Sequence, residues 1–324
     1  VMAEGTIDDG TINQEAWAGI AKYCEEKGIS NQSFQASENT QTARMDAVSL
    51  AVKRGAMLVV CSGASFQDTL VQAAKEFPDV TFLGLDCSIP EGSPKNAVGV
   101  TFSEVQAGFL AGYAAVENGW TKLGFFSEKK DSQSILYGYG FVQGAQAYAK
   151  AKEMPAQSVE IRYAYADKPG NTPENQAVAK EWFQNGAEAI FTIGYELTNG
   201  VIAAAEEFGK QVIGADVNWS DASQNVAISA VKHYSQAVQD LIDLSYNEEL
   251  TGGSTVQRTA AENGIALTMD DSHLKNFTRK SYDNLVIALA DDVSGMAADL
   301  VNTPAEDGSI GASGIVLSEV KVIE

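Results

Sequence analysis

Hydrophobic and polar positions alternate along this chain in a way that predicts helices and strands in regular succession. Near the start, Thr11 and Gln14 stand at capping-box spacing, and apolar residues from Trp17 onward recur at helical spacing until Gly28. Residues 57–61 then form a short run of apolar side chains, which is typical of a strand buried on both faces of a parallel sheet. The opening of the chain therefore indicates a βα rhythm.

The same rhythm continues through the rest of the chain. The expected strands after the opening one cover residues 57–61, 80–85, 97–102, 122–126, 159–165, 189–193, 211–215, 226–231 and 315–323, and the expected helices cover residues 11–28, 40–53, 65–77, 105–116, 139–152, 175–185, 200–208 and 235–246. Two such arrays in series predict an α/β protein with two doubly wound, Rossmann-like lobes and right-handed crossovers.

The length of the chain also favours two lobes. Single hydrophobic cores stop growing at about 250 to 300 residues, and this chain has 324. We assign residues 1–101 plus 233–268 to the first lobe and residues 102–232 plus 269–324 to the second, because the helix at 235–246 is expected to pack back on the first lobe.

Charge and hydropathy narrow the class of partner. The 43 acidic and 22 basic residues give a formal net charge of -21, which repels both a phosphate backbone and an anionic lipid surface, so no nucleic-acid partner is expected. No run approaches the roughly 18 apolar residues that cross a bilayer. Residues 1–5 resemble the stump of a buried first strand, so we expect a leader or lipid-anchored segment upstream, and contact with a membrane only through such an anchor.

The residues that usually perform catalysis or hold metals are scarce. Cys24, Cys61 and Cys87 form no CxxC motif and have no histidine at ligand spacing, so no metal site is expected. The chain contains no GxSxG elbow, no phosphate-binding loop and no GxGxxG after the first strand, and its only histidines are His233 and His273. We therefore expect a binding protein, with no cofactor, and not an enzyme.

The polar loop before the first helix is the first candidate binding segment. It carries Asp8, Asn13 and Gln14 close to a helix N-terminus, where free backbone N–H groups and the helix dipole favour an anionic or strongly polar group. Asn13 and Gln14 are suited to contact a base edge or a sugar. The alternative is that Asp8, Asp9 and Thr11 merely cap the helix and shape the turn, and neither interpretation excludes the other.

Two aspartates and a lysine follow apolar strands and form the second candidate set. Asp86 and Asp216 each end a strand, one in each half of the chain, and Lys232 comes directly after residues 226–231. Ligands of open α/β sheets bind beyond the carboxyl ends of the strands, where carboxylates can accept hydrogen bonds from sugar hydroxyls. The alternative for each residue alone is an ordinary turn or surface charge.

Three aromatic residues stand close to strand ends as well. Phe66, Tyr195 and Trp219 are candidates to stack on the ring of a ligand. Each of them could equally serve packing, and the sequence leaves that choice open.

Several longer stretches together resemble the basic-membrane-protein family of lipoproteins. They are GTIDDGTINQEAWAGI at 5–20, FPDVTFLGLD at 77–86, FSEVQAGFLAGYAA at 102–115, YGYGFVQG at 137–144, NGVIAAAEE at 199–207, VIGADVN at 212–218 and ISAVK at 228–232. Members of this family are substrate-binding components of ABC importers, typified by bacterial purine-nucleoside receptors. The resemblance covers nearly the whole chain, and the order of the motifs makes it specific.

The resemblance implies a type I periplasmic-binding-protein fold in an extracytoplasmic protein, either periplasmic or a cell-surface lipoprotein. It implies that a nucleoside-like ligand is clamped between the lobes and delivered to a membrane ABC permease. At the matching positions it implies that Asn13 contacts the base and that Asp86, Asp216 and Lys232 hold the sugar.

The chain departs from the family pattern at two positions. Ala3 stands where the family usually has Asp, and Ile12 stands where it has Phe. Loss of the phenyl ring removes a stacking face worth about 1 to 3 kcal/mol per base. The alternatives are a receptor of the same fold for a flavin, a sugar or a signalling molecule, and a nucleoside-cleaving enzyme that holds a metal on Asp8 and Asp9.

Overall fold

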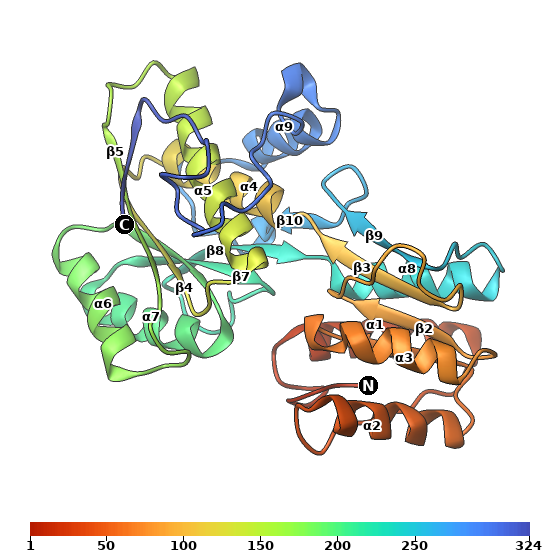
Figure 1. Ribbon diagram of the computed structural model, residues 1–324. Coiled ribbons are helices and arrows are strands. Elements are labelled where there is room, and N and C mark those ends of the chain that lie inside the picture. The colour runs from red at the N-terminus through yellow and green to blue at the C-terminus, as the bar shows by residue number, and fades with distance from the viewer. The chain divides into compact units, whose positions relative to one another are not determined.

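The computed structural model describes residues 1–324, and the contacts within the chain divide it into two compact units. The first unit comprises Val1–Phe102 and His233–Arg258, and the second comprises Ser103–Lys232 and Thr259–Glu324. Each unit is built on a largely parallel sheet with helices packed on it, which confirms the predicted α/β class (Figure 1).

The exact lobe boundaries drawn from the sequence stay a prediction. In the structure, residues 259–268 group with the second unit. They do so because β10 (Ile265–Leu267) pairs antiparallel with β8 (Val226–Lys232) at the edge of the sheet. No local pattern in the sequence predicts this pairing.

The first unit has a four-stranded parallel sheet in the order β1-β2-β3-β9. Its strands are β1 (Leu58–Ser62), β2 (Thr81–Leu85), β3 (Ala97–Phe102) and β9 (Ser254–Arg258). Consecutive residues of β2 are buried, and both α3 (Gln67–Glu76) and α8 (Tyr234–Tyr246) contact this strand. Cover on both faces explains why β2 has an uninterrupted apolar run instead of alternation.

The helices of the first unit pack in pairs. α1 (Ile12–Lys27) packs against α8, and α2 (Gln41–Lys53) packs against α3. α1 begins after Thr11, whose hydroxyl accepts a hydrogen bond from the backbone N–H of Asn13, and it ends at Gly28 with φ of 67°. The expected opening strand is reduced to Met2, which forms parallel bridges to Gln35 and Ser62.

The second unit has a seven-stranded sheet in the order β10-β8-β7-β6-β4-β5-β11, and only β10 runs antiparallel to its neighbour. Its further strands are β4 (Lys122–Ser127), β5 (Val159–Tyr165), β6 (Ala189–Ile193), β7 (Gln211–Asp216) and β11 (Val320–Ile323). The parallel strands place their carboxyl ends along one edge of the sheet, where the predicted residues Asp216 and Lys232 lie.

Two helices of the second unit approach each other so closely that their backbones touch. These two are α4 (Glu104–Glu117) and α5 (Ser132–Ala151); the unit also contains α6 (Pro173–Gln184), α7 (Tyr195–Phe208) and α9 (Arg279–Ala290). A Cβ on Gly112 of α4 would lie 1.9 Å from the carbonyl oxygen of Phe141, and one on Gly144 of α5 would lie 2.0 Å from that of Phe109. Only glycine fits at these contacts, so the two helices are held at a fixed distance.

Three elements were not predicted from the sequence, and one was predicted too long. β9 is mostly polar and has no fully buried residue, β10 has three residues, and α9 buries few side chains, so none of them shows a clear period. The last strand was expected over residues 315–323 but covers Val320–Ile323. Before it, the backbone N–H groups of Ser318 and Glu319 donate to the side chain of Gln146 and not to a neighbouring strand.

Short 3-10 segments complete the chain: η1 (Ala64–Phe66), η2 (Met269–Asp271) and η3 (Val293–Gly295). None of the helices combines the length and the apolar character that a passage through a membrane requires.

Candidate functional site

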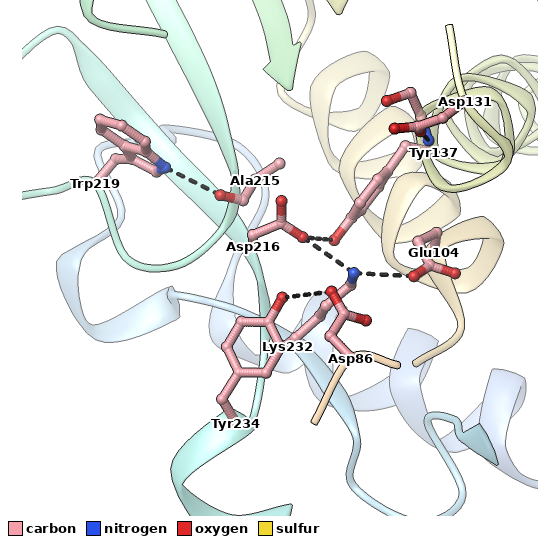
Figure 2. A network of polar contacts seen from close by, with 10 residues as sticks. Asp86, Glu104, Asp131, Tyr137, Ala215, Asp216, Trp219, Lys232 and Tyr234 are labelled. Atoms are coloured by element: carbon pink, nitrogen blue, oxygen red, sulfur yellow. Dashed lines mark hydrogen bonds and ion pairs between the residues drawn. The ribbon is translucent and has the colours of Figure 1, made fainter. Parts of the chain in front are cut away.

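A group of four polar side chains lies at the carboxyl ends of β7 and β8 in the second unit (Figure 2). Asp216 is the last residue of β7 and Lys232 the last of β8, while Glu104 opens α4 and Tyr137 lies in α5. β7 and β8 are paired neighbours, with Asp216 opposite Val231. Their pairing brings together the aspartate and the lysine that the sequence predicted in this half of the chain.

Lys232 is the centre of this group. Its Nζ lies 2.9 Å from Oε1 of Glu104 and 3.2 Å from Oδ1 of Asp216, and it lies 5.5 Å from the centroid of the Tyr137 ring. The side chain is 1% exposed. An ammonium buried to this degree stays charged only where opposite charges compensate for lost hydration, and here two carboxylates do so.

The backbone at Asp216 adopts an uncommon conformation. Its φ is 67°, in the left-handed region, and the N–H of Val217 donates to the carbonyl of Ala215 at 2.8 Å across a three-residue turn. The indole Nε1 of Trp219 donates to the same carbonyl at 3.0 Å. Aspartate tolerates this region better than most residues do, and such local strain is concentrated at binding sites.

The two carboxylate oxygens of Asp216 differ in their surroundings. Oδ1 accepts a hydrogen bond from the Tyr137 hydroxyl at 2.8 Å and forms an ion pair with Lys232 at 3.2 Å. Oδ2 accepts none, and the side chain is 36% exposed. Burial, and next the charge of Asp216, raises the pKa of Tyr137 well above its usual range, so this hydroxyl remains a donor at neutral pH. The carboxylate is thus held by one oxygen and offers the other as an acceptor.

Aromatic side chains accompany these residues in the second unit. Tyr195 opens α7 just after β6, and this residue is 42% exposed. The ring lies 5.2 Å from that of Trp219, at an interplanar angle of 41°. Trp219 itself is buried. Of the predicted aromatic residues, Tyr195 therefore offers an accessible face, and Trp219 supports it from behind.

The first unit also carries an aspartate in the left-handed region after a strand. Asp86 follows β2 and has φ of 53°. It is 8% exposed, and its Oδ2 accepts a hydrogen bond from the hydroxyl of Tyr234 at 3.2 Å. This carboxylate is consequently more buried than that of Asp216.

The loop before α1 is organised around Asp9. Its carboxylate accepts hydrogen bonds from the backbone N–H of Thr6, from both the N–H and the hydroxyl of Thr11, and from the amide of Asn13. Partial burial acts to raise the pKa of Asp9, but these hydrogen bonds outweigh it and lower the pKa below its usual value. The amide of Asn13 also donates to the carbonyl of Glu4 at 2.9 Å, so it stabilises the loop.

The other predicted residues of the first unit have different surroundings. Asp8 is exposed and accepts a hydrogen bond from the hydroxyl of Thr6 at 2.6 Å. Gln14 is also exposed and accepts from the N–H of Gly10 at 3.0 Å, not from Thr11 as a capping box would have it. Phe66 is fully buried in the hydrophobic core, which is the packing role that the sequence left open.

A cavity is found in each unit. One of about 420 Å³ lies in the first unit, lined among others by Asn13, Trp17 and Tyr246. Another of about 580 Å³ is lined by residues including Gln211, the first residue of β7, and therefore lies at the opposite end of that strand from Asp216. Neither cavity contains Asp86, Asp216 or Lys232.

Sequence reasoning missed Glu104 and Tyr137 as members of the polar group. Both stand in stretches that carried the family resemblance, FSEVQAGFLAGYAA and YGYGFVQG. A further signal was the glycine spacing of these stretches, because a Cβ on Gly108 would lie 2.1 Å from the carbonyl oxygen of Tyr137. The close contact of α4 with α5 brings the two side chains to Lys232 and Asp216.

Solved structures show what this fold is similar to. A solute-binding protein of an ABC transporter system from Conexibacter woesei matches with a TM-score of 0.72 at 20% identity, covering 91% of this chain and 95% of the other. One from Aeropyrum pernix matches with a TM-score of 0.69 at 20% identity, covering 90% and 85%. These matches confirm the type I periplasmic-binding-protein fold.

Sequence comparison identifies relatives that are substrate-binding or basic membrane proteins. The ABC transporter nucleoside-binding protein BmpA of Lactococcus lactis is 23% identical over 305 residues, covering 86% of this chain and 84% of the relative. Basic membrane protein D of Borreliella burgdorferi is 26% identical over 285 residues, covering 86% and 80%. A family model for PnrA-like ABC transporter substrate-binding proteins matches residues 1–291, and this chain therefore belongs to the Bmp family.

Proposed function

We propose that this protein binds a nucleoside, a purine nucleoside first of all, or a similar compound with a ring and a sugar, and passes it to a membrane ABC permease. Proteins of its family bind solutes outside the cytoplasm, with a small molecule and a permease as partners. The Lactococcus relative is named as a nucleoside-binding protein, which supports the choice of a nucleoside. A lipid anchor upstream of the sequence is part of the same proposal.

The observation that carries the proposal is the half-exposed carboxylate of Asp216. Tyr137 and Lys232 hold its Oδ1, and Oδ2 is available to accept a hydrogen bond. A carboxylate oriented in this way is suited to a sugar hydroxyl, which must donate when it meets an acceptor-only group.

The exposed ring of Tyr195 adds a second element to the proposal. It lies at the same edge of the sheet, since β6 and β7 are parallel neighbours, and an aromatic face can stack on a base. Such stacking would replace in part the ring that the family has where this chain has Ile12. Contributions from Asp8, Asn13, Gln14, Phe66, Asp86 and Trp219 stay predictions.

A thermal-shift panel tests the class of ligand. Adenosine, guanosine, inosine, free bases, ribose and riboflavin would each be added to the protein. A ligand present at about 100 times its dissociation constant adds about 2.7 kcal/mol to the free energy of unfolding, so a bound nucleoside should raise the melting temperature clearly. Stabilisation by riboflavin or ribose alone would contradict the proposal. Chromatography of the added nucleoside should return it intact, and released base would indicate an enzyme instead.

Substitution of Asp216 tests the site itself. Asp216→Asn keeps a residue that tolerates the left-handed backbone and removes the negative charge, so the nucleoside-induced shift should fall by most of its value while the melting temperature of the free protein changes little. Asp221→Asn, on an exposed residue of the same connection, is the matched control and should keep the full shift. An unchanged shift in Asp216→Asn would remove this residue from the site.

A further inference from the structure

Glu104 is a charged residue in an unusual place. It is the first residue of α4 and is 4% exposed, although carboxylates are almost never buried to this extent without a partner. Its Oε1 lies 2.9 Å from Nζ of Lys232. Because the helix dipole is positive at its N-terminus, this position favours the charged form of Glu104.

The balance of charge around Lys232 depends on this residue. Asp216 also pairs with Lys232, but its side chain is 36% exposed, so water screens part of its charge. Glu104 is almost fully buried and is the nearer of the two to the ammonium. A buried lysine without adequate compensation loses its proton at neutral pH. Of these two carboxylates, Glu104 therefore contributes more to the field that keeps Lys232 charged.

We propose that Glu104 is a positioning residue, which keeps the Lys232 ammonium charged and directed at Oδ1 of Asp216 so that Oδ2 faces the ligand. Glu104 has its effect through Lys232, because one of its carboxylate oxygens is directed at the ammonium (Figure 2) and its side chain is only 5% exposed. The ligand readout below rests on the proposed function, but the titration that precedes it does not.

The titratable groups that face the ammonium within the second unit come from three elements. α4 contributes Glu104, β7 contributes Asp216 and α5 contributes Tyr137, whose ring lies 5.5 Å from Nζ. Tyr137 stays neutral at ordinary pH, since burial raises its pKa well above the usual range. On β10, the residue paired with Lys232 is Ile265, which carries no charge. The two carboxylates are thus the opposing charges in this set.

A titration of Lys232 in the ligand-free protein is the first test. The 13Cε chemical shift of Lys232, assigned by comparison with Lys232→Met, would be followed from about pH 5 to about pH 10. In the unsubstituted protein the ammonium should stay protonated through this range. In Glu104→Gln it should lose its proton at a clearly lower pH. Glu117→Gln, at the other end of α4 where Glu117 accepts from Ser281, should leave the titration unchanged.

Binding of adenosine is the second test. If the site requires the charged lysine, the dissociation constant of Glu104→Gln should rise about tenfold for each pH unit above the new pKa of Lys232, and it should approach the value of the unsubstituted protein below that pKa. The unsubstituted protein should bind with little dependence on pH. In the background of Lys232→Met, adding Glu104→Gln should change affinity less than twofold, because the two substitutions act through one group.

The outcomes separate this proposal from the proposed function. If Lys232 titrates identically in both proteins, the positioning role of Glu104 is wrong, whatever the ligand proves to be. If Lys232 titrates as expected but adenosine binds neither protein, the positioning role stands and the ligand is another compound. Should Glu104→Gln fail to fold, the pair Glu104→Gln with Lys232→Met should fold again, because the double substitution removes both buried charges of the Glu104–Lys232 pair and leaves Asp216 with its Tyr137 hydrogen bond and solvent. Failure of the pair as well would overturn the proposal.

Discussion

Asp86 in the first unit and Asp216 in the second offer a direct comparison. Both follow an apolar parallel strand, and both have φ in the left-handed region, at 53° and 67°. Asp86 is 8% exposed and accepts from Tyr234, whereas the carboxylate of Asp216 is 36% exposed and keeps Oδ2 available. The same local pattern thus gives the same backbone but a different availability to a ligand.

The polar networks of the two units differ in the same sense. In the first unit, Asp9 gathers donors from Thr6, Thr11 and Asn13, all within a few residues of the chain. In the second unit, Lys232 is held by Glu104 and Asp216, which belong to separate elements. The network around Asp9 shapes a loop, while the network around Lys232 depends on the packing of a whole unit. Disturbing the Lys232 network should therefore lower the free energy of unfolding more.

The largest effect is expected from Lys232→Met. It leaves the carboxylate of Glu104 buried without its cation, and breaking one side of a buried ion pair costs about 3 to 5 kcal/mol in the free energy of unfolding. Urea denaturation measures this. Lys27→Met removes the exposed ion pair with Asp243 in the first unit and should cost at most about 1 kcal/mol. Equal losses in the two variants would erase the contrast between the units.

A smaller effect should separate Tyr234→Phe from Tyr137→Phe. Tyr234→Phe takes a donor from the buried Asp86 and should cost about 1 to 3 kcal/mol of stability. Tyr137→Phe should cost about 0.5 to 1.5 kcal/mol, because Lys232 and water can still satisfy Asp216, but it should weaken ligand binding by freeing the carboxylate to rotate. Denaturation of both variants measures the two stability losses, and ligand titration measures the weaker binding of Tyr137→Phe. A larger stability loss in Tyr137→Phe than in Tyr234→Phe would mean that Asp216 is the more buried acceptor.

The smallest effect concerns Asp9 and depends on pH. Its pKa is lowered in the folded protein, so its contribution to stability is complete above the unfolded pKa of about 3.9 and is lost as the pH falls through the folded pKa. Asp9→Asn should therefore reduce the free energy of unfolding by less than about 1 kcal/mol at neutral pH, since solvent screens the group. The difference from the unsubstituted protein should vanish on acidification, and a difference independent of pH would contradict this origin.

Much of the fold followed from local patterns. Apolar runs such as those of β2 and β7 identified strands, and helical spacing identified α1, α2 and α6, because each pattern reflects burial within a few residues. β10 escaped prediction because three apolar residues show no period, and its pairing with β8 is a contact between distant segments. The strand expected at the start of the chain is present only as two bridges of Met2.

The sequence by itself determined which residues stand at the ends of strands. Asp86, Asp216 and Lys232 were identified there because each of them directly follows an apolar run. Only the tertiary structure decided that Glu104 and Tyr137 join Asp216 and Lys232. The reason is that α4 and α5 approach through glycine contacts, such as that of Gly108 with the backbone of Tyr137, and local periodicity carries no information about which helices will meet. Because these charges are buried, they are stable only when paired with an opposite charge, and this requirement joins them in one network.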